Sequence, residues 1–144
     1  MSGGPLAVGG KACLIGENVG FYLAGNNAVL NFGPNTSISL TAPKEGNLAG
    51  LLFFEDRNAA MGVMHRISSN DARMLLGTIY LSRNTLSVDA NAPVADESAY
   101  TAIIARKLLL DAGPNLVLNS NYSATDIPVS NTLSGVGGRI VLAR

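Results

Sequence analysis

The stretch Ala28-Val-Leu-Asn-Phe-Gly-Pro-Asn-Thr-Ser-Ile-Ser-Leu-Thr-Ala-Pro43 contains two short apolar runs on either side of a Gly-Pro-Asn turn. In the second run, Ile38 and Leu40 alternate with serine and threonine. A period of two places one set of side chains in a core and the other set in water, as in a half-buried strand. The stretch therefore predicts two strands joined by a turn of glycine, proline and asparagine.

The same organisation continues in both directions along the chain. Short apolar or alternating runs lie between turns rich in Gly, Asn, Pro and Asp, at 6–8, 12–15, 19–23, 28–32, 37–41, 48–54, 65–68, 75–81, 85–89, 100–110, 116–119 and 139–142. Many short strands with frequent turn signals predict an all-β fold. Comparable stretches return at loose intervals of about 18–25 residues, which is typical of the stacked turns of a solenoid.

Two all-β architectures fit this pattern. The Asn-Gly and Asp-Gly dipeptides that favour tight hairpins are absent, which weakens the case for an antiparallel β-sandwich. We therefore favour a short right-handed β-solenoid, a single domain over residues 6–144, with the sandwich as the alternative. Residues 1–5 are expected to be a disordered leading segment. They lack the features of a signal peptide, and we expect the chain to be part of a longer protein.

Three segments depart from simple alternation. The runs 48–54 and 100–110 are almost continuously apolar, so we expect other parts of the protein to cover both of their faces. The second run could form a helix, but the β-branched residues Thr101, Ile103 and Ile104 favour a strand. Residues 69–76 contain fair helix formers, and we expect a loop there with one helical turn at most.

The composition disfavours several classes of partner. The chain has 144 residues, of which 47% are hydrophobic and 14% charged, and its formal net charge is zero. No basic stripe interleaved with aromatic residues is present, so nucleic acid is not an expected partner. A surface with so little charge has little attraction for anionic lipid, and no apolar run is long enough to span a bilayer. We expect no membrane contact by this part of the protein itself.

The densest polar cluster is Glu55-Asp56-Arg57-Asn58, which follows Phe53-Phe54. Adjacent carboxylates on a strand point to opposite faces, so Glu55 and Asp56 do not form a matched acid/base pair. The cluster predicts a salt-bridged corner at a strand end. Its residues Phe53, Phe54, Glu55, Asp56 and Arg57 are our candidate interaction corner.

No catalytic, cofactor-binding or metal site is expected. His65 is the only histidine and Cys13 the only cysteine, so neither a zinc site with several histidines nor an intrachain disulfide can form. Asp96-Glu-Ser98 resembles the start of the Asp-x-Ser-x-Ser metal motif of von Willebrand type A domains, but Tyr100 replaces its second serine. Gly135-Val-Gly-Gly138 is glycine-rich, but no helix follows it to complete a phosphate cradle. An enzyme is therefore not the expected function.

A family resemblance is carried by several motifs in order. Leu40-Thr-Ala-Pro43 and Leu48-Ala-Gly-Leu-Leu-Phe-Phe-Glu-Asp-Arg57 resemble a hallmark stretch of TadG-like (TadE/TadG family) proteins of bacterial tight-adherence (Flp) pilus systems. Leu76-Gly-Thr-Ile-Tyr-Leu81 and Tyr100-Thr-Ala-Ile-Ile-Ala-Arg106 are similar to the next two rungs of that family. The segments Gly113–Asn119 and Tyr122–Val129 resemble the C-terminal tail of its alphaproteobacterial members.

The resemblance implies a location and a role. Such proteins are anchored in the cell envelope by an N-terminal membrane helix, so this chain would be the periplasmic or otherwise extracytoplasmic β-rich part of a membrane-anchored protein. It would act as a non-enzymatic structural or interaction module, with other pilus-assembly or envelope proteins as partners. The chain lacks the anchor and the von Willebrand-type domain of the fuller family pattern, so metal-dependent adhesion is not carried over.

Two other functions remain open at this point. One is a carbohydrate-binding or carbohydrate-active β-helix that uses Glu55, Asp56, Asp71 and Arg73; the lack of tryptophan and the eight Phe and Tyr residues disfavour it. The other is a self-assembling scaffold similar to bactofilins. A solenoid has open strand edges at its ends, which permit self-association unless they are capped, and Gly135–Arg144 is a candidate cap.

Overall fold

The short runs of the sequence stack as parallel strands. The computed structural model describes residues 1–111, 113 and 116–129, and these form a β-solenoid of about four turns. The coil is right-handed, as parallel connections between strands almost always are. The strands are β1 (Leu6–Val8), β2 (Cys13–Gly16), β3 (Phe21–Leu23), β4 (Leu30–Phe32), β5 (Ser37–Thr41), β6 (Leu51–Glu55), β7 (Met64–Ile67), β8 (Asp71–Val88) and β9 (Thr101–Leu110). A short 3₁₀ helix, η1, covers Tyr122–Ala124.

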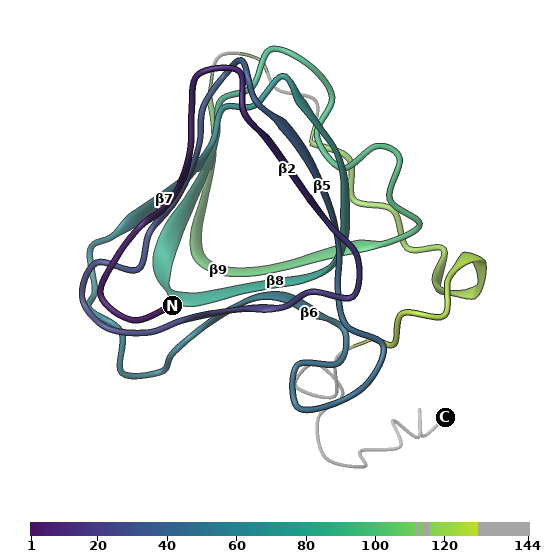
Figure 1. Ribbon diagram of the computed structural model, residues 1–144, viewed down its shortest axis with the longest axis horizontal. Coiled ribbons are helices and arrows are strands. Elements are labelled where there is room, and N and C mark those ends of the chain that lie inside the picture. The colour runs from purple at the N-terminus through teal and green to yellow at the C-terminus, as the bar shows by residue number, and fades with distance from the viewer. Residues whose placement is uncertain (112, 114–115, 130–144) are drawn as a thin grey trace, which may run out of the picture.

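The coil has three faces around one core, and it resembles a triangular prism when viewed along its axis (Figure 1). The β1 face contains β1, β4, β7 and the ends of β8 and β9. The β2 face contains β2, β5 and the start of β8. The β3 face contains β3, β6, the middle of β8 and the start of β9. Every pairing between these strands is parallel, so the predicted solenoid is confirmed and the antiparallel sandwich is not the fold.

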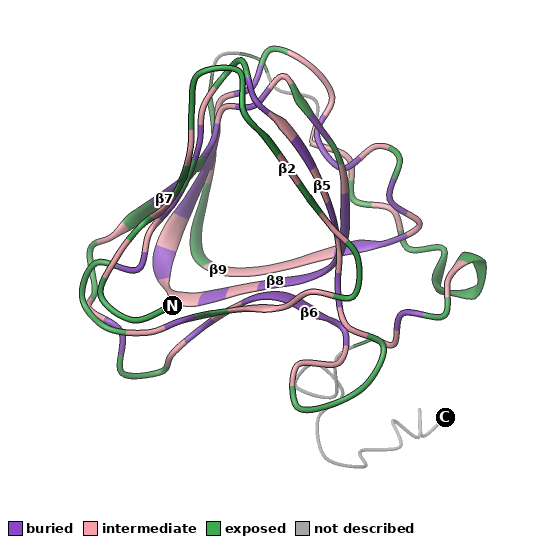
Figure 2. Ribbon diagram, viewed as in Figure 1, coloured by how far each residue is buried: buried purple, intermediate pink, exposed green. Residues whose placement is uncertain are grey.

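Columns of inward side chains fill the prism. On the β1 face, Val8, Phe32, Ile67, Val88 and Leu110 follow one another from turn to turn. The three middle members of this column are at most 1% exposed. Each of them is covered on both sides along the axis by its neighbours in the column. The core is therefore built by stacking similar apolar residues, and burial is deepest in the middle turns (Figure 2).

The turns differ in length because their corners differ. Leu6 pairs with Leu30, 24 positions later, and Arg66 pairs with Ser87, 21 positions later. Asn31, in contrast, pairs with Arg66, 35 positions later. The extra residues lie in two loops between faces, 42–50 and 56–63, and the strands on either side remain parallel and aligned. The additional residues of this long turn thus lie at the corners of the prism, and smaller register shifts occur within the β5–β8 and β6–β8 pairs.

The prediction of a loop over 69–76 is wrong from Asp71 onward, and only Ser69 and Asn70 lie outside the strand. Residues from Asp71 onward start β8, which pairs with β5 on the β2 face. Ala72 and Leu75 are at most 1% exposed inside the core. Burial of these side chains against the turn before outweighs the local helix propensity of the segment. The predicted runs 75–81 and 85–89 also belong to this one strand, which bends around the prism.

The two continuously apolar runs behave differently from each other. Thr101–Leu110 is a strand, β9, as the β-branched residues predicted. Leu51, Leu52 and Phe53 of β6 are all at most 4% exposed, as expected for a strand covered on both faces. β9 is not covered in this way, because Leu108 and Leu110 are 40% and 54% exposed. It is the last long strand of the described residues.

The beginning of the chain is paired with the coil. We expected residues 1–5 to be disordered, but Ser2 forms a parallel bridge with Ala24 and the Gly3 N–H donates to the Ala24 carbonyl at 3.0 Å. Near the other end, of the predicted run 116–119 only Leu116 forms a bridge, to Val94. The predicted strand 139–142, the turn 135–138 and the cap 135–144 lie outside the described residues. No helix in the described part of the chain is long and apolar enough to cross a membrane.

Candidate functional site

The predicted corner Phe53–Arg57 lies where β6 leaves the β3 face. Strand alternation points Phe53 and Glu55 into the prism, where they are 0% and 1% exposed. Phe53 packs against Phe21 of the preceding turn, with ring centroids 5.3 Å apart. A partner cannot reach these two side chains in the folded protein. The prediction of one continuous interaction corner is therefore wrong for Phe53 and Glu55, and only Phe54, Asp56 and Arg57 remain accessible.

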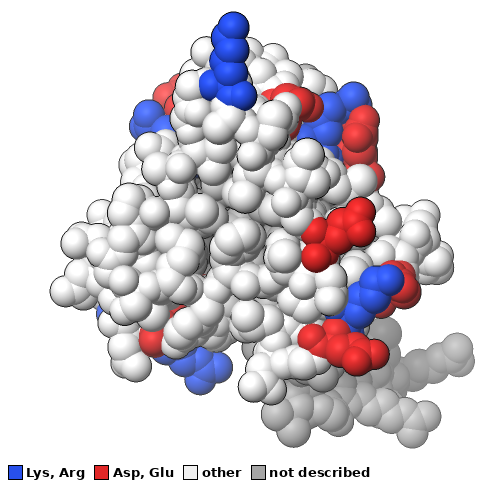
Figure 3. Space-filling view, in the orientation of Figure 1, with Lys and Arg blue, Asp and Glu red and all other residues white. Residues whose placement is uncertain are grey.

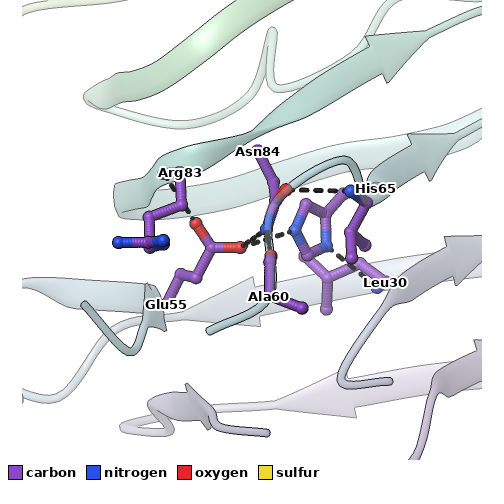
Figure 4. A network of polar contacts seen from close by, with 7 residues as sticks. Leu30, Glu55, Ala60, His65, Arg83 and Asn84 are labelled. Atoms are coloured by element: carbon purple, nitrogen blue, oxygen red, sulfur yellow. Dashed lines mark hydrogen bonds and ion pairs between the residues drawn. The ribbon is translucent and has the colours of Figure 1, made fainter. Parts of the chain in front are cut away.

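Glu55 is the centre of a buried polar network (Figure 4). Its Oε1 accepts hydrogen bonds from Asn84 Nδ2 at 2.6 Å and from His65 Nε2 at 3.1 Å. Its Oε2 accepts from the Arg83 backbone N–H at 2.9 Å. Glu55, His65 and Asn84 are all at most 1% exposed. A buried carboxylate is tolerated only when it accepts several hydrogen bonds, and three different residues supply them here.

Asn84 and His65 connect this carboxylate to neighbouring turns. Asn84 also donates to the Ala60 carbonyl at 2.7 Å and accepts from the Val63 N–H at 2.9 Å, so it holds the end of the loop 56–63. His65 Nδ1 accepts from the Leu30 N–H at 3.2 Å. Because Nδ1 is an acceptor, the ring proton lies on Nε2 and points at Glu55. The only histidine of the chain therefore serves a structural role in this network.

Opposing effects act on the pKa of Glu55. Burial alone raises the pKa of this carboxyl group, but hydrogen bonds from His65, Asn84 and the Arg83 N–H favour its ionised form. Together they hold the pKa below its ordinary value of 4.5. A carboxylate that stays ionised and fully hydrogen-bonded is neither a proton donor nor a free base near neutral pH. The hydrogen bonds of Glu55 instead hold neighbouring turns of the coil together.

This lowered pKa makes stability sensitive to acid. The unfolded chain binds a proton at Glu55 more readily than the folded chain, so the stabilisation is complete above about pH 4.5 and is lost as the pH falls through the folded-state pKa. In urea unfolding experiments from neutral to acidic pH, the midpoint concentration of urea should decrease once the pH falls below about 4.5. Glu55→Gln removes this titration and should flatten the acid slope, whereas an unchanged slope in this variant would show that other carboxyl groups cause it.

Outward aromatic residues form a second feature that the sequence analysis missed. Tyr22, Phe54 and Tyr80 occupy the same outward position in three successive turns of the β3 face. Their ring centroids lie 5.7 Å and 5.2 Å apart, and the ring planes are within 16° of parallel. We call these three residues the aromatic ladder. The repeated pairs Phe21-Tyr22, Phe53-Phe54 and Ile79-Tyr80 are the signal that could have revealed it.

The accessible residues of the corner adjoin this ladder. The Tyr22 hydroxyl donates to Asp56 Oδ2 at 2.5 Å, and this bond lowers the pKa of the Asp56 carboxyl group. The Asp56 Oδ1 accepts from the Asn58 N–H at 2.8 Å, which fixes the start of the loop 56–63. The Arg57 carbonyl accepts a hydrogen bond from Arg83 Nη1 at 2.8 Å. Phe54 thus belongs to the aromatic ladder, Asp56 is hydrogen-bonded to it through Tyr22, and Arg57 follows as the next residue of the chain.

The residues expected for carbohydrate chemistry do not come together. Asp71 accepts a hydrogen bond from Ser37 on the β2 face, and Arg73 forms ion pairs with Asp96 and Glu97. Both line a shallow hollow of about 250 Å³ on that face together with Cys13 and Ile15. Glu55 and Asp56 lie at the other end of the β3 face, with different partners. The structure thus separates the four residues into two unrelated groups.

The segment Asp96–Ser98, which resembles the start of a metal motif, makes structural contacts. Asp96 is bound by Arg73, and Ser98 Oγ accepts from the buried Leu75 N–H at 2.8 Å. In residues 1–111, 113 and 116–129, no group of three or more His, Cys, Asp and Glu side chains is placed to hold a metal ion. Cys13 is a free, exposed cysteine. Comparison of the chain with protein-family models, curated proteins and solved structures found no match.

Proposed function

We propose that this domain is a non-enzymatic interaction module of an extracytoplasmic protein of the tight-adherence pilus system. The aromatic ladder and the adjoining residues Asp56 and Arg57 would bind another protein of the cell envelope. The observation that carries this proposal is the division of the β6 segment. Its inward carboxylate, Glu55, is held in a structural network, while its outward Phe54 stacks between Tyr22 and Tyr80 in a partly exposed aromatic ladder.

The chemistry of the ladder favours a protein as the partner. Tyrosine and phenylalanine are enriched at protein–protein interfaces, and an exposed charged rim around them is typical of such surfaces. A sugar ring binds to the open face of an aromatic ring. In the ladder most ring faces pack on one another, which leaves mainly ring edges for a ligand. This geometry weakens the carbohydrate alternative.

The assignment to the pilus system depends on the ordered motifs of the sequence. Two of these motifs, Leu48–Arg57 and Leu76–Leu81, contain Phe54 and Tyr80 of the ladder. The motifs that resemble TadG-like proteins therefore also supply two of the three rings of the proposed surface. The proposed location is the periplasm or another extracytoplasmic compartment, where a membrane-anchored protein would hold the domain near its partners.

The double variant Tyr22→Ser/Arg57→Ala tests the proposed surface. Tyr22 is 42% exposed, and the Arg57 carbonyl that Arg83 uses is retained, so the fold should persist. In the full-length protein of the native host, we expect at least about tenfold fewer surface pili, because interface anchors contribute about 2 kcal/mol each. Pili are counted by electron microscopy, and the amount of the protein is checked by immunoblotting.

The matched control is Ile15→Ser, another exposed outward side chain of the first turn but on the β2 face. This variant should leave the number of pili unchanged. Equal effects of the control and the double variant would contradict the assignment of the surface. Normal piliation after deletion of the whole gene would overturn the pilus function itself.

A further inference from the structure

The last described turn of the coil has an open strand edge. A strand inside a parallel sheet has one neighbour on each side, but in the described part of the chain β9 pairs only with β8. On the β1 face its final residues, Lys107–Leu110, lie on Thr85–Val88 of the previous turn. No strand among residues 1–111, 113 and 116–129 pairs with the other side of this segment, which is the edge that a further parallel strand would use.

Core side chains are exposed at this distal end. Leu108 and Leu110 stand in the inward columns, directly after Leu86 and Val88. The two residues of the previous turn are 0% exposed, whereas Leu108 and Leu110 are 40% and 54% exposed. The difference arises because the earlier residues are covered by another turn. Leu108 and Leu110 are thus the uncovered end of an apolar core.

The proximal end of the coil presents the complementary edge. The Leu6 N–H donates to the Val29 carbonyl and the Val8 carbonyl accepts from the Gly33 N–H, so both groups point into the coil. By strand alternation, the backbone N–H and carbonyl of the exposed residue Ala7 point outward from the end. The end facing the viewer in Figure 3, to which the first turn belongs, carries its charged side chains around the periphery and few across its middle.

The two ends match in direction, register and chemistry. Both edges belong to the β1 face, and their strands run in the same direction. If another copy is placed after β9, its Leu6 follows Leu108 and its Val8 follows Leu110, which continues the two inward columns. Each copy would contribute one turn of the coil to the contact. A turn has 22 to 24 residues at the two ends, because Val94 pairs with Leu116 and Leu6 pairs with Leu30. Stable interfaces use about 20–30 residues on each side.

We propose that copies of this chain stack head to tail, with the distal edge of β9 pairing in parallel with the proximal edge of β1 in the next copy. The contact joins two different surfaces, so it does not close into a symmetric dimer and builds an open filament. The partner is a second copy of this chain. The inference does not depend on the proposed pilus function, because it concerns the ends of the coil rather than the aromatic ladder.

Two variants block one end each. Leu110→Lys places a charge on the exposed end of the core at the distal edge. Ala7→Pro removes the outward N–H at the proximal edge and leaves the inward side chains unchanged. Both residues are exposed, so circular dichroism and thermal unfolding should remain those of the unmodified chain. Ile15→Lys, on the outward β2 face, is the control for an added charge on an exposed aliphatic residue.

Analytical ultracentrifugation at rising protein concentration supplies the readout. The unmodified chain and Ile15→Lys should form a series of oligomers of increasing size, whereas Leu110→Lys and Ala7→Pro should each remain monomeric. An equimolar mixture of the two blocked variants should give dimers and nothing larger, since each retains one complementary end. A monomeric unmodified chain, association of either blocked variant alone, or a mixture that stays monomeric would overturn the proposal.

Discussion

Replacing Glu55 by alanine is expected to lower the free energy of unfolding by about 3–5 kcal/mol, because several buried donors lose their acceptor and each unsatisfied group costs about 1–3 kcal/mol. The substitution leaves Asn84 Nδ2, His65 Nε2 and the Arg83 N–H without their common acceptor. The Asn84 and His65 side chains cannot turn to water, because they are at most 1% exposed. Chemical denaturation followed by circular dichroism measures the effect.

Asp56→Ala is the matched control for this experiment. Asp56 is the next residue and also a carboxylate, but it lies on the outside and bonds to the exposed Tyr22 hydroxyl. Its other bond, from the Asn58 N–H, is exposed as well, and water can replace both bonds, so the denaturation midpoint should change little. If both variants lost the same stability, the buried network would not be the tie between turns that its geometry indicates.

Gly77→Ala is expected to destabilise the protein by about 3 kcal/mol or more, through overlap and backbone strain together. Gly77 lies in β8 where the strand passes from the β2 face to the β3 face. Its φ of 132° is rarely adopted by residues with a side chain, and an added Cβ would lie 2.6 Å from the Ala42 Cβ. Ala42 is fully buried, so it has no room to move away. Thermal unfolding measures the loss.

The control for Gly77 is Gly46, in the loop 42–50. Its φ of 86° is also positive, but nothing lies within 4 Å of an added Cβ. Gly46→Ala should therefore cost about 1 kcal/mol, from backbone strain alone. Similar losses in the two variants would mean that β8 can shift at this corner and that the close approach to Ala42 does not restrict it.

Strand positions were largely predictable because each strand carries its own signal. Ser37–Thr41 was identified with its observed bounds, since Ile38 and Leu40 alternate with polar residues and point into the core. The β-branched residues of β9 likewise identified a strand where its length also allowed a helix. The start of β8 could not be found in this way. Asp71–Leu76 is a strand only because β5 lies beside it. The paired residues are far apart in the sequence, since Ser37 of β5 precedes its partner Asp71 by 34 positions.

The buried network was less accessible to sequence reasoning. Glu55 follows two phenylalanines, and its adjacency to Asp56 and Arg57 indicated a salt-bridged corner at a strand end. Strand alternation does predict that Glu55 and Asp56 point to opposite faces. It does not tell which one is inside, and a glutamate is rarely buried. The side chains that make burial possible, His65 and Asn84, come from later parts of the coil, and nothing local marks them as its partners.

The uneven turns have a consequence for how relatives of this protein should be recognised. Because all the additional residues of the long turn lie in the loops 42–50 and 56–63, two related chains can differ by a whole loop and still superimpose strand on strand. An alignment that expects a constant repeat length would shift out of phase at such a loop and score the following strands as unrelated. Gaps placed freely at the three corners, with matching restricted to the faces, would keep equivalent inward positions together.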